Sequence, residues 1–222
     1  MFSRMQLLAT PGEISRRFGI GLLAAERFQP SEAISAFDHL HHPVITNEKP
    51  SVADCSFRWG LVPPDWNKSP EAIWNHTISA KLEYLDKRYA WKQVAQNRCF
   101  IPVTAYFEYH WNDPKGKSKT RYIIRNKEMR IFALAGLYAE WLSGGHILHT
   151  FAICTTAGNE IMQFVHNKDA ARDYFRMPVM LNPGDEHQWL DMKNNYLDFA
   201  YPNYRPNLFA APEIEGMQGI LF

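Results

Sequence analysis

Short runs of β-branched and aromatic residues, separated by turn sequences, are the feature that most constrains the fold of this chain. Such side chains favour extended strands. Between the runs, residues 112–117 (Asn-Asp-Pro-Lys-Gly-Lys) and 143–145 (Ser-Gly-Gly) are typical of hairpin turns. The predicted strands cover residues 99–101, 121–124, 130–134 and 149–154. We therefore expect an α+β fold built on a largely antiparallel, barrel-like mixed sheet.

Short helices are expected around this sheet. Residues 11–18 carry apolar positions four apart and are followed by Gly19, a pattern typical of a short amphipathic helix. Further helices are predicted over residues 82–95, 159–166 and 183–190, the last with Asn182 as its N-cap and Pro183 in its first turn. The apolar face of the 82–95 helix is expected to consist of Leu82, Leu85, Tyr89 and Val94.

Length and composition limit the class of protein. A chain of 222 residues fits one domain, which we expect to span residues 1–222. It has no apolar segment of the roughly 20 residues that a membrane-spanning helix needs, and residues 1–10 lack a secretory signal. We expect a soluble, cytoplasmic monomer. The cysteines, Cys55, Cys99 and Cys154, show no metal-type spacing, so we expect reduced thiols, no metal and no cofactor.

Charge and aromatic content bear on nucleic-acid binding. A formal net charge of +1 gives no bulk basic surface, so any DNA site must be local. Aromatic residues make up 14% of the chain, and their rings can stack on unpaired bases. Most rings of this kind nevertheless lie in protein cores.

Two motif blocks far apart in the chain carry the clearest functional signal. Residues 58–66 begin Arg-Trp-Gly-Leu-Val-Pro and end at Trp66, and residues 176–181 read Arg-Met-Pro-Val-Met-Leu. Together with residues 102–108 and Thr155-Thr156, their order and spacing resemble the SOS-response-associated peptidase family, whose members recognise abasic sites in single-stranded DNA. The resemblance extends to about Asp191, which leaves residues 192–222 as a C-terminal extension.

Glu108 and His166 are the candidate proton-transfer residues. A carboxylate flanked by aromatic residues is costly to desolvate, so Glu108 must be paired or functional. Histidine titrates near neutral pH, which suits proton transfer, although a lone histidine is more often structural. The resemblance implies that both residues belong to the active site.

The resemblance also implies a mechanism. In the family, removal of the initiator Met exposes a cysteine, whose α-amine attacks the aldehyde of the ring-opened abasic sugar. Its thiol then closes a stable thiazolidine, which crosslinks protein to DNA. The glutamate and histidine shuttle protons, and an asparagine and an arginine hold the sugar and its phosphate.

This chain departs from that pattern at several positions. It begins Met1-Phe2-Ser3-Arg4, without a cysteine, and the bulky Phe2 predicts that Met1 is retained. Ser79 stands for the asparagine and loses its amide's reach, and Lys81 stands for the arginine and loses its bidentate fork. The segment between His166 and Arg176 is longer than usual. The implied catalytic set is Met1, Phe2, Ser79, Glu108 and His166.

A DNA-binding groove is also implied. Its basic groups are expected on phosphates and its indoles against sugars or unstacked bases. The residues assigned to it are Arg4, Trp59, Trp66, Lys81, Thr155 and Arg176.

Three hypotheses from different classes remain open. The first is an abasic-site-processing enzyme with associated autopeptidase activity, in which the true start lies elsewhere or the α-amine of Met1 forms an imine alone. The second is a catalytically inactive module that binds single-stranded DNA or protein. The third is an unrelated hydrolase that uses Cys99 or Cys154 with His166, or a metal on His39, His41 and His42. The third has the least support, because both cysteines lie in apolar runs and the histidines lack a carboxylate at ligand spacing.

Overall fold

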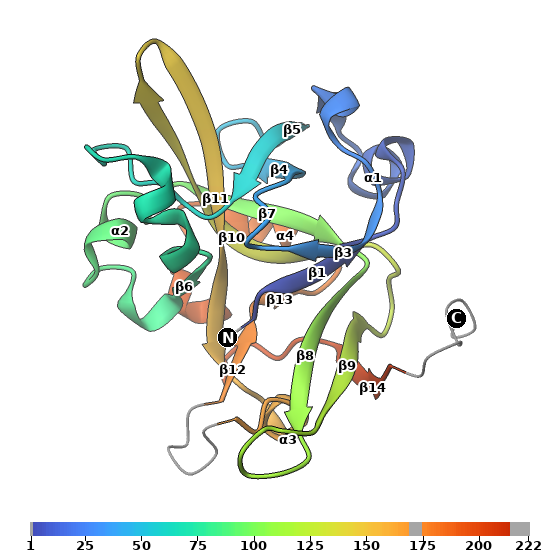
Figure 1. Ribbon diagram of the computed structural model, residues 1–222. Helices are drawn as coiled ribbons and strands as arrows, with labels where there is room; N and C mark the ends of the chain where they lie inside the picture. Colours follow the sequence, from blue (N-terminus) through green and yellow to red (C-terminus); the bar gives the residue numbers. More distant parts are fainter. Residues whose placement is uncertain (1, 169–174, 214–222) are drawn as a thin grey trace.

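A closed ring of strands forms the centre of the computed structural model, which describes residues 2–168 and 175–213 (Figure 1). Antiparallel pairing joins β5, β4, β7, β10 and β11 in that order. A parallel pairing of β5 with β11 then closes the ring. The strands are β4 (His41–Thr46), β5 (Val52–Trp59), β7 (Arg98–Val103), β10 (Phe132–Ser143) and β11 (His146–Ala157). The predicted α+β, barrel-like mixed sheet is confirmed.

Apolar side chains that point inward from the strands fill this barrel. Along β5, buried positions alternate with partly exposed ones, as expected for a strand with one face in the core. Its last residue, Trp59, stacks on Phe151 of β11 with ring centroids 6.2 Å apart. The long β10–β11 hairpin turns at residues 143–146 and extends beyond the rest of the molecule (Figure 1).

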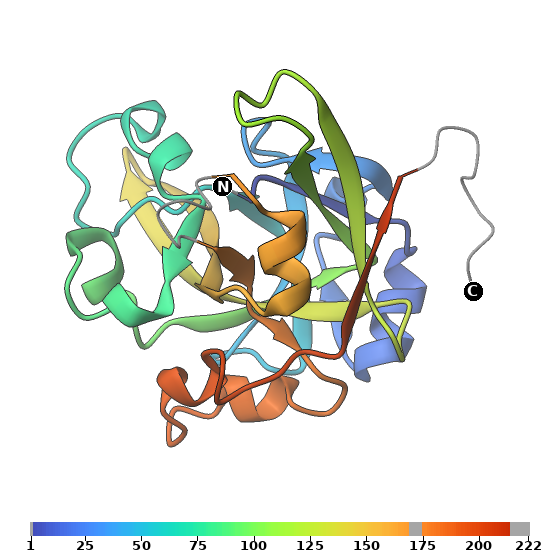
Figure 2. The same ribbon diagram turned by 90° about the horizontal axis from the view of Figure 1, so that it is seen from below.

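A second sheet packs beside the barrel and carries part of the site. Its strand order is β14 (Leu208–Pro212), β9 (Lys119–Asn126), β8 (Ala105–Trp111), β1 (Arg4–Leu7) and β3 (Ser31–Ser35). The β8–β9 hairpin turns over residues 112–118, as the sequence predicts. The C-terminal extension adds β14 to the edge of β9 (Figure 2), so this part of it completes a sheet.

Four short strands pair with parts of the barrel strands that extend beyond the closed ring. β2 (Gly21–Leu23) pairs with β5, β6 (Ser79–Lys81) and β12 (Arg176–Pro178) pair with β11, and β13 (Met180–Leu181) pairs with β10. Across the described residues, no helix has the length and apolar character needed to cross a membrane.

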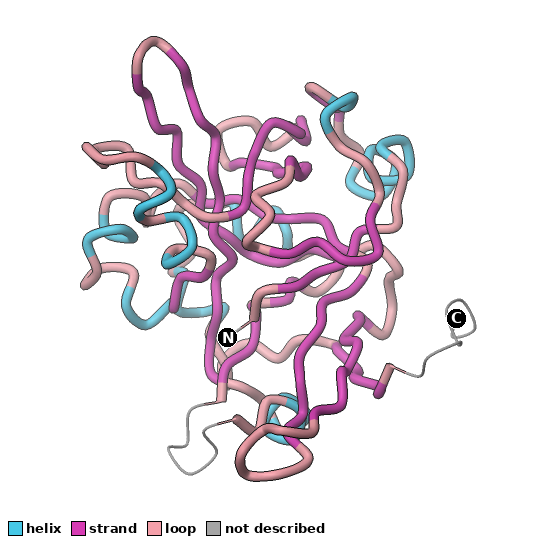
Figure 3. The backbone as a smooth tube through the Cα atoms, viewed as in Figure 1, coloured by secondary structure: helices cyan, strands magenta, loops and turns pink. Residues whose placement is uncertain are grey.

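The helices are short and lie around the strands (Figure 3). α1 (Pro11–Phe18) confirms the first predicted helix: a capping box of Thr10 and Glu13 starts it, and Gly19 ends it in a left-handed conformation. α3 (Glu160–Val165) is confirmed as well, with Asn159 as its N-cap. Single 3₁₀ turns cover Ala25–Arg27, Pro70–Ala72, Trp74–His76, Leu82–Tyr84 and Tyr196–Phe199.

Two helix predictions were wrong in detail. The continuous helix over 82–95 is replaced by a 3₁₀ turn and α2 (Tyr89–Lys92), and Tyr89 is 54% exposed. The buried apolar residues there are Leu82, Leu85, Trp91 and Val94, so Trp91 and not Tyr89 belongs to the apolar face. α4 (Glu186–Leu190) begins after Asp185. Asn182 does not cap it, because its side chain bonds the backbone of Arg205 and Asn207 instead.

Candidate active site

Glu108 and His166 meet where α3 packs against β8. Glu108 lies on β8, and His166 follows the last residue of α3. His166 Nδ1 is 2.8 Å from Glu108 Oε2, and both side chains are at most 10% exposed. The structure thus brings the two sequence-predicted proton-transfer residues together.

The environment of Glu108 favours its ionised form. Burial acts to raise the pKa of the carboxyl, but the contact with His166, its positive charge and the Tyr109 amide together lower it. Tyr109 N donates to Glu108 Oε1 over 3.1 Å. A carboxylate that keeps its charge while nearly buried can accept a proton, and the adjacent imidazole can supply one.

Four contacts between β8 and the segment formed by α3 and the residues after it bring this pair into register. His110 Nδ1 donates to the carbonyl of Phe164 over 2.8 Å, and the two rings stack with centroids 4.7 Å apart. Next to His166, Asn167 pairs with the backbone of Trp111: it accepts from the Trp111 N–H at 2.7 Å and donates to the Trp111 carbonyl at 2.9 Å. The side chain of Asn167 therefore acts as a short strand against the end of β8.

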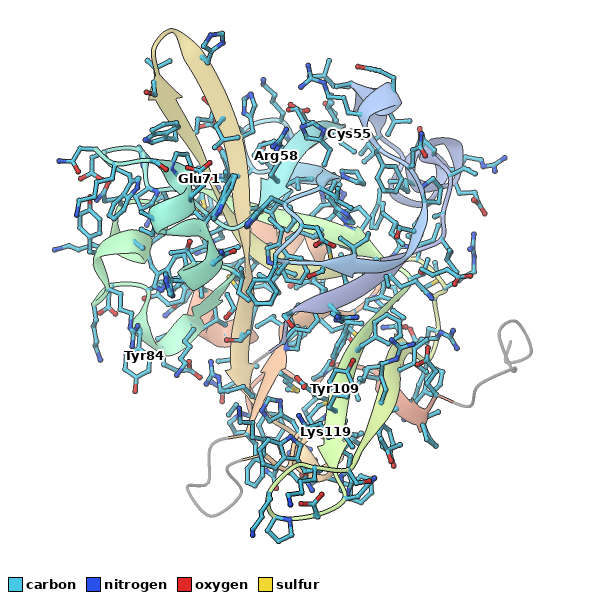
Figure 4. All side chains as sticks on the ribbon, viewed as in Figure 1. Cys55, Arg58, Glu71, Tyr84, Tyr109 and Lys119 are labelled. Carbon is cyan, nitrogen blue, oxygen red and sulfur yellow. The ribbon has the colours of Figure 1, made fainter. Side chains whose placement is uncertain are left out.

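A pocket of about 220 Å³ opens over the pair. Figure 4 labels two of its residues, Tyr109 and Lys119, in the lower part of the β8–β9 hairpin. Its lining is aromatic and cationic apart from the carboxylate, and consists of Glu108, Tyr109, Trp111, Lys119, His166 and Lys168.

The family model for the SOS response associated peptidase (SRAP) matches residues 1–208. The chain belongs to the SRAP family. Its match continues past the limit near Asp191 that the sequence motifs alone indicate and reaches the start of β14.

Named relatives agree with this assignment, and a solved structure shares the fold. The abasic site processing protein YoqW of Bacillus subtilis is 32% identical over 221 residues, which cover 98% of this chain and 92% of that protein. YoaM of the same organism, also named an abasic site processing protein, is 31% identical over 98% of this chain and 90% of its own length. A crystal structure from Bacteroides thetaiotaomicron shares the fold, with a TM-score of 0.82 at 22% identity, over 96% of this chain and 92% of that one.

The two residues that the sequence motifs align with the family's asparagine and arginine lie on a neighbouring group of strands. Ser79 and Lys81 form the ends of β6, and Lys81 is opposite Thr155 of β11. Arg176 of β12 binds both oxygens of Glu83 at 2.9 Å and the Thr155 carbonyl at 2.7 Å. Burial and the charge of Arg176 lower the pKa of Lys81.

The other residues assigned to the groove differ in accessibility. Arg4 is exposed on β1. Trp66 is partly buried, and its indole N–H donates to the Ser69 carbonyl over 3.0 Å. Trp59 is 1% exposed and donates to the Ile78 carbonyl. A ring enclosed in this way offers no face to a base, so the structure contradicts the expectation that Trp59 stacks on DNA.

β1 lies beside β8, the strand that carries Glu108. Arg4 pairs with Phe107, and the antiparallel register directs the chain ahead of it, at Ser3 and Phe2, along β8 past Glu108. Phe2 is 5% exposed and packs between Trp59 and Tyr106, with ring centroids 5.4 and 5.3 Å away. Its side chain therefore serves the core. Met1 falls outside the described residues.

The cysteines offer no reactive thiol to an alternative hydrolase. Cys99 and Cys154 are fully buried, which raises the pKa of both thiols. Burial also raises the pKa of Cys55, to about 11. Each sulfur is held in its protonated, unreactive form.

The three histidines of the cluster do not act together either, because each has its own separate partners. His39 contacts the Trp59 carbonyl and Asn75, His41 accepts from Arg58, and His42 donates to the Pro102 carbonyl. Burial lowers the pKa of His42 to about 4. Within residues 2–168 and 175–213, no group of three His, Cys, Asp or Glu side chains is arranged to hold a metal. These facts argue against the hydrolase hypothesis.

Sequence reasoning missed Trp111, Lys119, Asn167 and Lys168. Lys119 begins β9, ahead of the strand predicted over residues 121–124, and Asn167 and Lys168 directly follow His166. The proximity of Trp111, Asn167 and Lys168 to the two motif residues was a usable signal, which Lys119 lacked. What no pattern shows is that Asn167 binds backbone groups, which are the same for every residue type.

Proposed function

We propose that this protein binds single-stranded DNA and processes abasic sites in it, with Glu108 and His166 as its proton-transfer pair. The observation that carries the proposal is this buried pair, 2.8 Å apart, under a pocket with cationic walls. Membership of the SRAP family and the names of the relatives YoqW and YoaM support it.

The covalent step would begin from an amine at the start of the chain. The amine nitrogen attacks C1′ of the open-chain sugar aldehyde. Glu108, kept ionised, accepts one proton from the nitrogen and passes it to the former carbonyl oxygen, which gives the carbinolamine. His166 then protonates the hydroxyl, which leaves as water, and the protonated imine that remains between protein and sugar returns its N–H proton to His166 to become the imine. The register of β1 against β8, which directs the chain start past Glu108, supports this choice of nucleophile.

Without a thiol beside the amine, the adduct stops at the imine. An imine hydrolyses in water, so we expect no heat-stable crosslink to form unless borohydride reduces it. The test incubates the protein with an abasic single-stranded oligonucleotide, with and without borohydride, and locates the modified residue by peptide mass spectrometry. Expected is trapping at the α-amine in the reduced sample only. Trapping at a lysine would reject the nucleophile, and equal binding of abasic and intact strands without trapping would reject the function.

The second hypothesis, a binding module without chemistry, has one observation in its favour. The guanidinium that the resemblance assigns to the phosphate, Arg176, is held by both oxygens of Glu83. A protein of this kind would bind abasic and intact strands alike and give no trapped product. The same experiment therefore decides between the two hypotheses.

A further inference from the structure

Two lysines from different parts of the chain meet at Trp111 on the pocket wall. Lys119 is the first residue of β9, and Lys168 lies in the segment after α3, next to Asn167. Their ammonium nitrogens lie 5.2 and 5.5 Å from the centroid of the Trp111 ring. At these distances each cation is attracted by the indole. All three residues line the pocket that contains Glu108 and His166.

The position of Trp111 is fixed from two sides. Asn167 binds its N–H and its carbonyl. The turn of the β8–β9 hairpin folds Gly116 against the indole, where a Cβ would lie 2.6–2.7 Å from three ring carbons, and the φ of +62° there also favours glycine. One face of the ring is thus covered by backbone. The indole is a rigid support for the lysine side chains.

The charges around this wall favour an anion. Like charges held near one ring repel each other, and an anionic ligand would relieve that repulsion. The carboxylate in the pocket, Glu108, is already paired with His166. In the adjoining turn, Asp113 accepts from the backbone N–H groups of Lys115 and Ser118, so its charge is directed into the turn.

We propose that Lys119 and Lys168, supported by Trp111, form a phosphate subsite for the nucleotide that flanks the abasic sugar. This inference rests on the proposed function and names the part of the substrate that the pocket wall binds. The sugar would reach Glu108 and His166 while its neighbouring phosphate lies between the ammonium groups. The subsite is built on β9 and the segment after α3, separate from the strands that carry Lys81 and Arg176.

The test combines protein variants with neutral phosphates in the DNA. Single methylphosphonates are placed at successive positions around an unreactive tetrahydrofuran abasic site, and affinity is measured for wild type, Lys119→Ala, Lys168→Ala and Trp111→Leu. At one position the neutral linkage should weaken wild type by about 3- to 10-fold yet barely affect the lysine variants. With unmodified phosphates, each lysine variant should lower the salt slope by about 0.7.

Lys115→Ala and Lys117→Ala are matched controls, because both lysines lie on the β8–β9 turn close to Lys119 but do not line the pocket. They should keep the wild-type pattern across all methylphosphonate positions. If wild type binds but the variants at 119 and 168 behave like these controls, the subsite is rejected while the proposed function stands. If wild type fails to bind the abasic strand at any salt concentration, both are rejected. Circular dichroism and melting temperatures identify any variant that fails to fold.

Discussion

The barrel and the pocket of this protein are held together by different forces. In the barrel, side chains such as Trp59 and Phe151 are at most 1% exposed and are fixed by packing and by backbone pairing between strands. At the pocket, Asn167 and His110 fix the geometry through bonds from side chain to backbone. Apolar burial is non-directional, whereas these polar contacts depend on direction.

The comparison predicts that the two regions fail differently. Loss of a core ring should lower the free energy of unfolding of the whole molecule while leaving the pocket's chemistry intact in the folded fraction. Loss of a polar contact at the pocket should change chemistry or binding more than it changes stability. The following predictions test that division.

The largest effect is expected at Glu108. Glu108→Gln keeps the shape but removes the proton acceptor, so the rate of imine trapping should fall by about 10²- to 10⁴-fold. Glu140→Gln is the matched control, because Glu140 also contacts a histidine, His149 at 3.3 Å, on the β10–β11 hairpin. The control should trap within about twofold of wild type. Wild-type trapping by Glu108→Gln would exclude the carboxylate from the mechanism.

Phe2 tests the barrel side of the comparison. Phe2→Ala removes a ring packed between Trp59 and Tyr106 and should lower the free energy of unfolding by about 3–5 kcal/mol, measured by urea denaturation. Phe2→Cys should lose stability for the same reason. Phe37→Ala, at a position 55% exposed, should change stability by no more than about 0.5 kcal/mol. Equal effects at both positions would contradict the packing role of Phe2.

The barrel was predictable from sequence in part: the signals of β7, β10 and β11 are local, whereas β4 and β5 are not among the predicted strands. The hairpin turns and the runs of strand-forming residues predict antiparallel neighbours, and the spacing of Phe57 and Trp59 by two along β5 marks a buried face. That spacing also contains the signal that Trp59 belongs to the core. The parallel closure of β5 on β11 is not predictable in this way, since it joins segments that no short pattern relates.

The pocket was predictable only in part. The motifs identify Glu108 and His166, and the longer segment before Arg176 does not separate them. The resemblance does not show that the Glu83 carboxylate binds the Arg176 guanidinium. This pairing depends on the positions of β6 and β12 beside β11. Nor does it show the role of Asn167, whose partners are backbone atoms.

A variant of Glu83 tests whether its polar contact with Arg176 weakens binding of single-stranded DNA. Glu83→Gln removes the carboxylate that holds Arg176 and should raise affinity for single-stranded DNA by about 3- to 10-fold, with a salt slope steeper by about 0.7. Glu26→Gln, which removes a surface charge beside Arg27, is the control and should change neither quantity. Weaker binding by Glu83→Gln would mean that Arg176 must stay paired to keep the site in shape.

A smaller effect is expected at Asn167. Asn167→Ala removes two hydrogen bonds to Trp111 and should lower the free energy of unfolding by about 1–2 kcal/mol. Because His166 is the adjacent residue, the pH profile of imine trapping should also change. Asn112→Ala removes two side-chain bonds within the exposed turn and should leave that profile unchanged. An unaltered profile in Asn167→Ala would limit Asn167 to a stabilising role.

The smallest effect is the pH dependence of stability that Glu108 contributes. Its pKa in the folded protein lies below the carboxyl's ordinary value of 4.5, so the unfolded chain binds a proton at higher pH than the folded one. The stabilisation from its charge is therefore fully present above the ordinary pKa and is lost as the pH falls through the folded-state pKa. Urea denaturation of wild type and Glu108→Gln over a pH series measures this. The stability difference should be constant at mildly acidic to neutral pH and change in favour of Glu108→Gln as the carboxylate protonates. A difference that stays constant throughout the acid range would show that burial cancels the contact with His166, and that the pair contributes chemistry without stability.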